Sequence, residues 1–232
     1  FQSTLKIKRS KFFFSDHHAS HAMSALPFVE NFSMDGRYLN LTFDAYGDGL
    51  SSTVSVFDRG QFQLICHNPF PNSVGLFYSA FAQFCGFQPN EGEYKLMALA
   101  GFGEPKYLDF ILDTMIDVDG ANFKLNMDWF IFDNDGTKYF SDKFTEKFGQ
   151  PAGANFFDRA YEAESFRHYA DVAASAQSAL EYVLSHSIDW AIKKTGIGDI
   201  VLSGGVAQNC VAVSRVADTH GVHSITVPPS PG

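Results

Sequence analysis

The segment at residues 200–209 limits the possible folds more than any other part of the sequence. It opens with the apolar residues Ile-Val-Leu, continues through Ser203 into Gly204 and Gly205, and goes on into helix-forming residues. A short, wholly apolar strand is typical of a parallel sheet that is covered on both faces. A strand, a glycine turn and a helix in this order place backbone N–H groups at the carboxyl end of the strand, where α/β folds bind nucleotides. The sequence therefore predicts an α/β protein with a nucleotide-binding turn at Gly204 and Gly205.

Other elements follow from the periodicity of apolar residues. Three runs with the alternation of strands predict a meander at residues 38–43, 52–57 and 62–67. Apolar stripes with helical spacing predict a helix at 73–85 and a long one at 166–194, which ends at Gly196. Residues 105–160 are expected to be irregular, with a hairpin turn at 117–120.

A glycine-rich turn, Asp44-Ala45-Tyr46-Gly47-Asp48-Gly49, lies between the first two predicted strands. Gly47 and Gly49 can adopt positive φ and bring backbone donors close to an anion. Asp44 and Asp48 would then hold a metal ion, or a water bound to it, beside that anion. Ordinary hairpin turns have the same composition, so a purely structural role stays open.

Three histidines stand close together near the start of the sequence, in Asp16-His17-His18-Ala19-Ser20-His21. On a helix capped by Asp16, His17 and His21 are four residues apart and leave the same face. That is the spacing of a two-histidine metal site, which leaves coordination positions free for a substrate. The alternative is a polar helix start with solvated or capping histidines. His18 points elsewhere, and we expect it to make a supporting hydrogen bond.

Composition limits the functional classes. The 232 residues are 45% hydrophobic, which is ample for a globular core, and contain no run of 18 apolar residues that would indicate a membrane span. No export signal opens the sequence, so we expect a cytoplasmic protein. A net charge of −9 disfavours a nucleic-acid partner. The three cysteines, Cys66, Cys85 and Cys210, are expected to be reduced and buried.

The order of the two glycine turns is the layout of the second half of the actin, Hsp70 and sugar-kinase fold, which is ribonuclease H-like. More specifically, the chain resembles the O-carbamoyltransferases of the nodulation and antibiotic-tailoring type, in the part similar to the universal tRNA threonylcarbamoyladenosine enzyme. Seven segments in family order carry this resemblance: residues 17–22, 44–49, 75–78, 93–100, 148–151, 171–177 and 203–210.

The resemblance also implies how the domain is organised. Residues 1–232 would be part of the transferase domain, incomplete at both ends, with 1–36 as the end of a first lobe that carries the histidine helix. Residues 37–232 would be most of the second lobe, with the irregular insertion at about 105–160. A first phosphate loop, a further metal-binding aspartate and a separate adenylate-forming domain are expected outside these residues, so this chain alone is not expected to carry the complete reaction.

By the same resemblance, the chemistry is carbamoyl transfer. Such enzymes make carbamoyl-adenylate from carbamoyl phosphate and ATP, which is bound with Mg²⁺, and transfer the carbamoyl group to a hydroxyl of a sugar, a nodulation factor or an antibiotic. The catalytic metal, Fe²⁺ in preference to Zn²⁺ or Mn²⁺, would be held by His17, His21 and Asp44. The remaining implied site residues are Gly47, Asp48 and Gly49 at the phosphate, Gly204, Gly205 and Asn209 at adenosine, and Lys95 as a neutraliser of anionic charge.

Two other functions stay open at this stage. One is a threonylcarbamoyl transferase that acts on tRNA, which shares the fold and the paired histidines but calls for a basic surface. The other is a nucleotide-binding scaffold related to actin or Hsp70, without transfer chemistry and without need of the two histidines.

Overall fold

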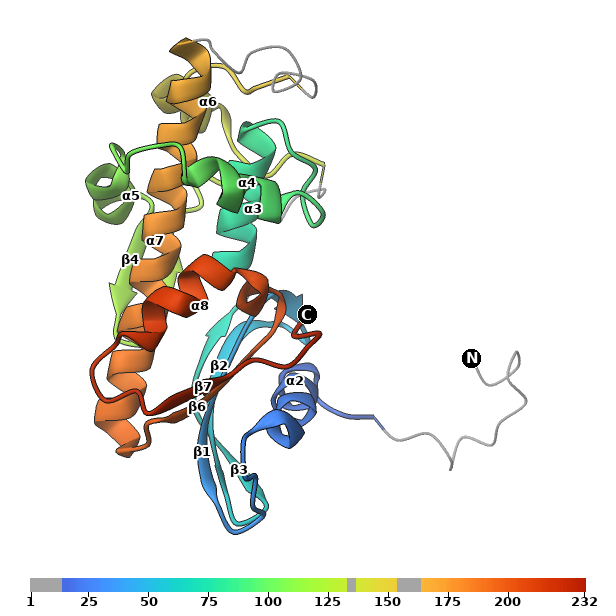
Figure 1. Ribbon diagram of the computed structural model, residues 1–232. Coiled ribbons are helices and arrows are strands. Elements are labelled where there is room, and N and C mark those ends of the chain that lie inside the picture. Colours follow the sequence, from blue (N-terminus) through green and yellow to red (C-terminus); the bar gives the residue numbers. More distant parts are fainter. Residues whose placement is uncertain (1–13, 133–136, 154–163) are drawn as a thin grey trace.

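The computed structural model describes residues 14–132, 137–153 and 164–232 (Figure 1). The first half contains α2 (His17–Ala25), the 3₁₀ turn η2 (Leu26–Phe28), β1 (Arg37–Gly47), β2 (Leu50–Asp58), β3 (Gln61–Pro69), α3 (Val74–Phe84) and α4 (Glu93–Ala100). The second half contains α5 (Leu108–Thr114), β4 (Ile116–Asp119), β5 (Asn122–Leu125), α6 (Asp142–Phe148), α7 (Glu164–Thr195), β6 (Asp199–Ser203), η3 (Gly205–Gln208), α8 (Cys210–Ala217) and β7 (Ser224–Thr226).

The main sheet has five strands in the order β3-β2-β1-β6-β7. The first three strands form the predicted antiparallel meander, and β6 pairs in parallel with both β1 and β7. In the β1–β6 pairing Thr42 lies opposite Ser203. Because parallel strands end at the same edge, this register brings Asp44 beside Gly204 and Gly205. The predicted α/β class, the meander and the strand before the glycine turn are confirmed.

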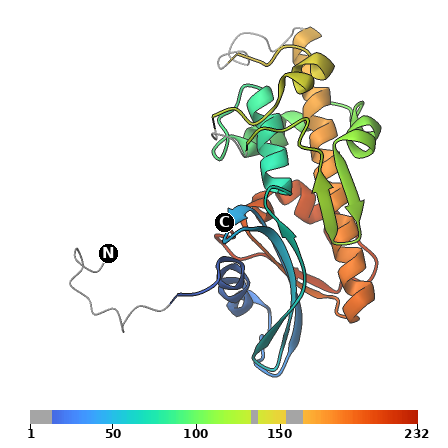
Figure 2. The ribbon, with the colours of Figure 1, turned by 180° about the vertical axis from the view of Figure 1, so that it is seen from behind.

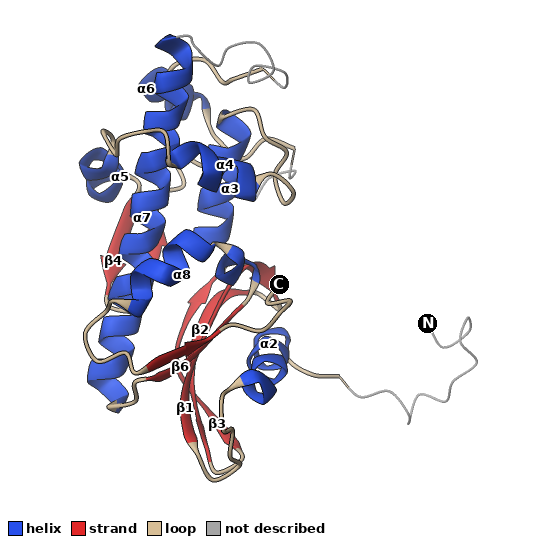
Figure 3. Cartoon of the chain, in the orientation of Figure 1, coloured by secondary structure: helices blue, strands red, loops and turns tan. Residues whose placement is uncertain are grey.

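The two faces of the sheet pack against different helices. Figures 1 and 3 show α2 on one side of the sheet and α7 on the other. Side chains alternate along β1 accordingly, so that Tyr38 packs in the small cluster under α2 with Ala25 and Val201, while Leu39 and Leu41 join the large core. Burying both faces explains why the middle of β6, Ile200 to Leu202, is wholly apolar. The assignment of two actin-like lobes stays a prediction.

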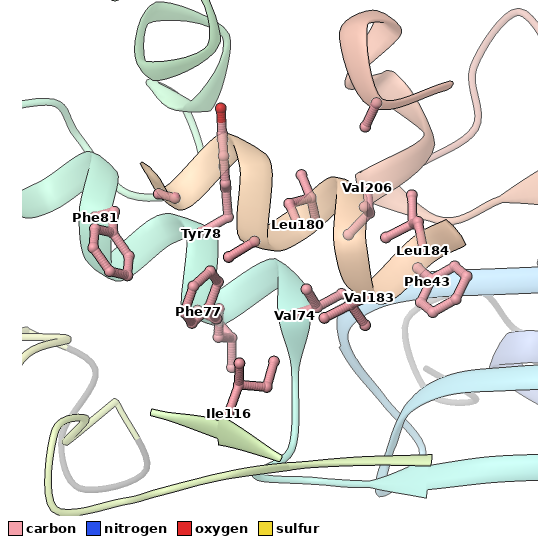
Figure 4. Close-up of a cluster of buried hydrophobic side chains, with 14 of the residues drawn as sticks. Phe43, Val74, Phe77, Tyr78, Phe81, Ile116, Leu180, Val183, Leu184 and Val206 are labelled. Atoms are coloured by element: carbon pink, nitrogen blue, oxygen red, sulfur yellow. The ribbon is translucent and has the colours of Figure 1, made fainter. Parts of the chain in front are cut away.

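The large core fills the space between the sheet and the helical half of the molecule. Figure 4 shows Phe77 and Phe81 of α3 in one cluster of buried side chains with Leu180 and Val183 of α7. The predicted long helix is confirmed as α7, with 32 residues, and it ends before Gly196, whose φ is +69°. Neither α7 nor any other described helix combines the length and apolar character needed to cross a membrane.

The region 105–160 is more regular than predicted. Its described part contains α5, the β4–β5 hairpin, which lies along α7 in Figure 2, and α6. The two helices have seven residues each and no side-chain cap, so their ends carry little sequence signal. Phe144 and Phe148 hold α6 on the core by packing against Phe81 and Phe84.

The cysteines differ in their surroundings. All three are free thiols, as predicted, and Cys66 and Cys85 are buried. Cys210 is exposed, which corrects the expectation of a buried residue. It is the first residue of α8, where its side chain leaves the helix away from the core side formed by Ala212 and Val216.

Candidate metal centre and adjoining cavity

The histidines belong to α2, which begins as the sequence predicts. The carboxylate of Asp16 accepts a hydrogen bond from the amide of Ala19 at 2.8 Å and caps the helix. The stripe of His18, Ala22 and Ala25 is buried and faces the sheet. His17 and His21 are therefore presented together on the neighbouring face of the helix, toward the carboxyl end of β1.

Three side chains converge at this point. The Nε2 atom of His17 lies 2.7 Å from Oδ2 of Asp44, and Nε2 of His21 lies 3.2 Å from the same oxygen. The two Nε2 atoms are 3.1 Å apart. Asp44 comes from β1, where the pairing with β2 is irregular between Phe43 and Gly47. This is the one group of metal-ligating side chains with such spacing in the described part of the chain.

The carboxylate of Asp44 is fixed from its other side. Its Oδ1 atom accepts hydrogen bonds from the amide of Ala45 at 2.8 Å and from that of Gly205 at 3.4 Å. Burial would raise the pKa of Asp44, but hydrogen bonds from His21, His17 and Ala45 outweigh it and hold this pKa well below its usual range. In return, Asp44 raises the pKa of His21, although burial opposes the effect. Asp44 is thus an oriented anion at neutral pH.

The geometry of the three side chains fits a divalent cation. Ligand bonds of about 2.0–2.2 Å place neighbouring ligand atoms about 3 Å apart, close to the three separations here. Without a metal, both imidazoles can donate an Nε2–H group to Asp44. The two Nε2 atoms, 3.1 Å apart, are then both donors and cannot hydrogen-bond to each other. A cation at the centre would use all three lone pairs at once, and imidazole with carboxylate is a donor set suited to Fe²⁺ or Zn²⁺.

The tip of the β1–β2 hairpin lies against α2. Oδ2 of Asp48 accepts a hydrogen bond from the amide of His17 at 2.8 Å. A Cβ atom on Gly47 would come within 2.0 Å of the His17 ring, so this position has room only for glycine. Asp48 and Gly49 have φ of +51° and +83°, as expected for a tight turn. The assignment of Gly47, Asp48 and Gly49 to a phosphate stays a prediction, since none of the three lines the cavity described next.

A cavity of about 350 Å³ adjoins the three converging side chains, within the size range of small-ligand sites. Asp44 and Gly205 belong to its wall, so the cavity reaches one residue of the candidate metal centre. The remaining lining comes from four parts of the chain. These are β1 with Ala45, α3 with Gly75, Tyr78 and Ser79, the segment 90–97 with Asn90, Glu91, Glu93, Tyr94 and Met97, and the C-terminal half with Leu180, Val206, Gln208, Asn209 and Gly232.

Asn209 is held rigidly in this wall. Its Oδ1 caps α8 by accepting from the amide of Ala212 at 2.9 Å, and its Nδ2 donates to Oε1 of Gln177 at 2.9 Å. The hydroxyl of Tyr78 donates to the same Gln177 oxygen at 2.7 Å. Burial raises the pKa of Tyr78, which keeps this hydroxyl neutral and able to donate. The amide of Asn209 is therefore oriented before any ligand binds.

Glu93 is the carboxylate in the wall most firmly held by neighbours. It accepts hydrogen bonds from the hydroxyl of Ser79 at 2.5 Å and from the amide of Asn90 at 2.8 Å. Sequence reasoning named neither Glu93 nor Tyr78 nor Gln177 as site residues. All three lie within the segments that carry the family resemblance. Their position in those segments is the feature of the sequence that could have identified them as site residues.

The other predicted residues have distinct positions. Gly204 has φ of +85°, and a Cβ atom there would lie 2.2 Å from the carbonyl oxygen of Phe43, so glycine allows β1 and β6 to end side by side. Its amide donates to the carbonyl of Pro231 at 2.7 Å. Lys95 is exposed on α4 beside the ring of Tyr94 and is not part of the cavity wall.

His18 differs from the prediction of a supporting hydrogen bond. It is buried, and within the described residues neither ring nitrogen has a partner with hydrogen-bonding geometry. Burial lowers the pKa of His18, and the backbone of Leu50 opposes this shift in part. The ring therefore serves as neutral packing between α2 and the hairpin.

The fold and the site together define a mixed α/β domain with a candidate metal centre at the edge of a cavity. The chain belongs to the carbamoyltransferase N-terminal family, because the model described as "Carbamoyltransferase N-terminus" matches residues 2–232. This confirms the resemblance inferred from the seven sequence segments.

The chain is also similar to individual proteins and to a solved structure. The chain is 38% identical over 226 residues to the uncharacterized protein sll1178 of Synechocystis, covering 94% of this chain and 34% of that protein. It is 29% identical over 198 residues to the nodulation protein NolO of Bradyrhizobium diazoefficiens, covering 84% and 32%. The crystal structure of HypF from T. kodakarensis matches with 13% identity and a TM-score of 0.48, covering 93% of this chain and 34% of that one. The chain thus spans about a third of the length of these relatives.

Proposed function

We propose that this chain is the transferase part of an ATP-dependent O-carbamoyltransferase. In this proposal a carbamoyl group passes from carbamoyl-adenylate to a hydroxyl of a small molecule such as a sugar, a nodulation factor or an antibiotic. Membership of the carbamoyltransferase N-terminal family supports carbamoyl as the group that is transferred. The similarity to the nodulation protein NolO supports a nodulation factor among these acceptors.

The observation that carries the proposal is the position of Asp44. One oxygen of its carboxylate meets the two imidazoles, and the other accepts from the amide of Gly205 in the cavity wall. A ligand in the cavity would therefore have one end beside His17, His21 and Asp44. A transferase must hold the donor and the acceptor in contact with each other, so its donor-binding cavity has to adjoin the group that catalyses transfer.

The three side chains would hold a divalent cation, Fe²⁺ by preference. Such an ion polarises a carbonyl and lowers the pKa of a bound hydroxyl. His17 and His21 supply neutral nitrogen ligands from one rigid helix. Asp44 supplies a negative charge, and the amides of Ala45 and Gly205 keep its carboxylate in one orientation. The ligand atoms are thus arranged before substrate arrives, which reduces the reorganisation needed during reaction.

The cavity wall fits a nucleoside. Tyr94 and Met97 offer apolar surface for a base, while Glu93 and Asn209 offer a carboxylate and an amide for polar groups of the ligand. We place the adenosine of carbamoyl-adenylate here, with its carbamoyl end toward Asp44. Gly205 lines the same cavity, and without a side chain it would allow the nucleotide to approach its backbone closely.

The experiment separates the two half-reactions in a protein with the length of the relatives. Carbamoyl phosphate, ATP and candidate hydroxyl acceptors are supplied, and adenylate formation and transfer are measured separately. His21→Ala should abolish transfer and spare adenylate formation, because the proposal assigns the adenylate to another part of the protein. Normal transfer by His21→Ala in the presence of a chelator would contradict the proposal. A protein that binds ATP but transfers nothing would instead be a nucleotide-binding scaffold.

A further inference from the structure

The hairpin tip holds the first histidine of the candidate metal centre through the backbone. The carboxylate of Asp48 accepts a hydrogen bond from the amide of His17 at 2.8 Å, across a sequence separation of 31 residues. His17 is the first residue of α2, and the cap from Asp16 satisfies a different amide, that of Ala19. The bond from Asp48 is therefore a tertiary contact to the backbone at the first residue of the helix, in addition to the contact between the His17 ring and Asp44.

The backbone of Asp48 is adapted to this contact. Its φ of +51° turns the hairpin toward α2, and among non-glycine residues aspartate and asparagine tolerate this region best. The preceding Gly47 leaves no space for a Cβ atom next to the His17 ring. Asp48 thus contacts the backbone of His17, while Gly47 lies against its ring.

We propose that Asp48 is a positioning residue for the metal ligand His17, acting through its hydrogen bond to the backbone and not through its charge. This inference rests on the proposed metal centre. It gives the glycine hairpin a second role: the segment that was expected to face a phosphate also sets the distance between His17, His21 and Asp44. Residues that orient metal ligands in this way commonly change metal affinity about 10–100-fold when they are replaced.

Two substitutions separate geometry from charge. Asp48→Gly removes the carboxylate and keeps the left-handed turn without strain, since glycine adopts positive φ freely. Asp48→Asn removes the charge but keeps an acceptor oxygen and tolerates the same φ. Arg59→Gly is the matched control, because Arg59 has φ of +48° in the β2–β3 turn of the same sheet, where it has no bond to α2.

The 232-residue chain is titrated with Co²⁺, whose visible absorption reports ligand geometry. We expect Asp48→Gly to weaken Co²⁺ binding about 10–100-fold and to alter the spectrum, while Asp48→Asn and Arg59→Gly bind like the unsubstituted chain. Unchanged binding by Asp48→Gly would overturn the proposal. Equal losses in Asp48→Gly and Asp48→Asn would also overturn it, because the effect would then come from charge.

A second readout does not need a metal. Amide hydrogen exchange of His17, measured by NMR on the metal-free chain, should be slow in the unsubstituted protein and in Asp48→Asn, and fast in Asp48→Gly. If the unsubstituted chain binds no Co²⁺, the proposed metal function fails, and this exchange pattern still decides whether Asp48 positions His17. Equal exchange of the His17 amide in all three proteins would contradict the assignment of Asp48.

Discussion

Asp44 is the residue on which the candidate site depends most. Its two oxygens face different groups, one toward the imidazoles of α2 and one toward the backbone of the glycine turn after β6. A shift of this carboxylate would therefore disturb the metal ligands and the cavity wall together. Glycines on both sides make room for the arrangement, Gly47 next to the His17 ring and Gly204 next to the end of β1.

Gly47 leaves the space that the His17 ring occupies. In Gly47→Ala the added methyl would lie 2.0 Å from the His17 ring, so the ring must turn away from Asp44. We expect metal affinity to fall about 10–100-fold, the range found when the orientation of a metal ligand is lost. Isothermal titration with Zn²⁺ measures this. Gly153→Ala is the control, because a Cβ atom there meets nothing within 4 Å. Equal affinities of both variants for Zn²⁺ would show that the ring position is unimportant.

At the scale of elements, α7 organises the helical half by holding the loop between α4 and α5. Asp171 of α7 is buried and accepts from the amide of Glu104 at 2.8 Å. It also forms ion pairs with Lys106 at 2.6 Å and with Arg167 at 3.2 Å. Because α4 carries Glu93 and Tyr94, this contact fixes one wall of the cavity relative to the core.

The element-scale prediction follows from the pKa of Asp171. Burial would raise this pKa, but Lys106, the amide of Glu104 and Arg167 hold it below its ordinary value of 3.8. A lowered pKa in the folded protein contributes stability above the unfolded value, and this stability is lost as the pH falls through the folded value. We expect Asp171→Asn to lower the free energy of unfolding by about 1–3 kcal/mol at pH 7, and the difference to shrink in acid.

Urea unfolding at a series of pH values measures this difference. Asp189→Asn is the matched control on the same helix, since Asp189 is 40% exposed and pairs with Lys193 at 2.7 Å. Such exposed pairs contribute about 0.2–1 kcal/mol. A difference between Asp171→Asn and the unsubstituted chain that grows toward acid pH would contradict the direction of the Asp171 pKa.

At the scale of the whole molecule, the sequence predicts the parts of the fold that have strong periodicity. Alternating residues predict the meander, and the apolar residues that β6 and α7 bury predict the strand and the long helix. Periodicity alone does not predict that His17, His21 and Asp44 converge. The spacing of the two histidines on α2 indicates two ligands, and tertiary packing brings the third beside them. The glycine turn made Asp44 a candidate for holding a metal ion, and the family resemblance joined it to the two histidines.

Other features could not be read from the sequence for physical reasons. The helices α5 and α6 are short and held by aromatic packing with distant residues, which leaves no local signal. The bond between Asp48 and His17 joins residues that a hairpin and a helix bring together, so its existence depends on how α2 lies on the sheet. The outward position of Lys95 on α4 likewise depends on which face of that helix meets the core.

Metal stoichiometry, measured together with the ligand distances, shows whether His17, His21 and Asp44 bind one divalent cation. The chain is purified anaerobically, loaded with Fe²⁺ or Zn²⁺, and studied by elemental analysis and X-ray absorption beside the double variant His17→Ala/His21→Ala. We predict one ion per chain, with imidazole nitrogens at about 2.0–2.2 Å, and loss of this ion in the double variant. Equal metal content in both proteins, or an absorption spectrum without imidazole ligands, would contradict the account.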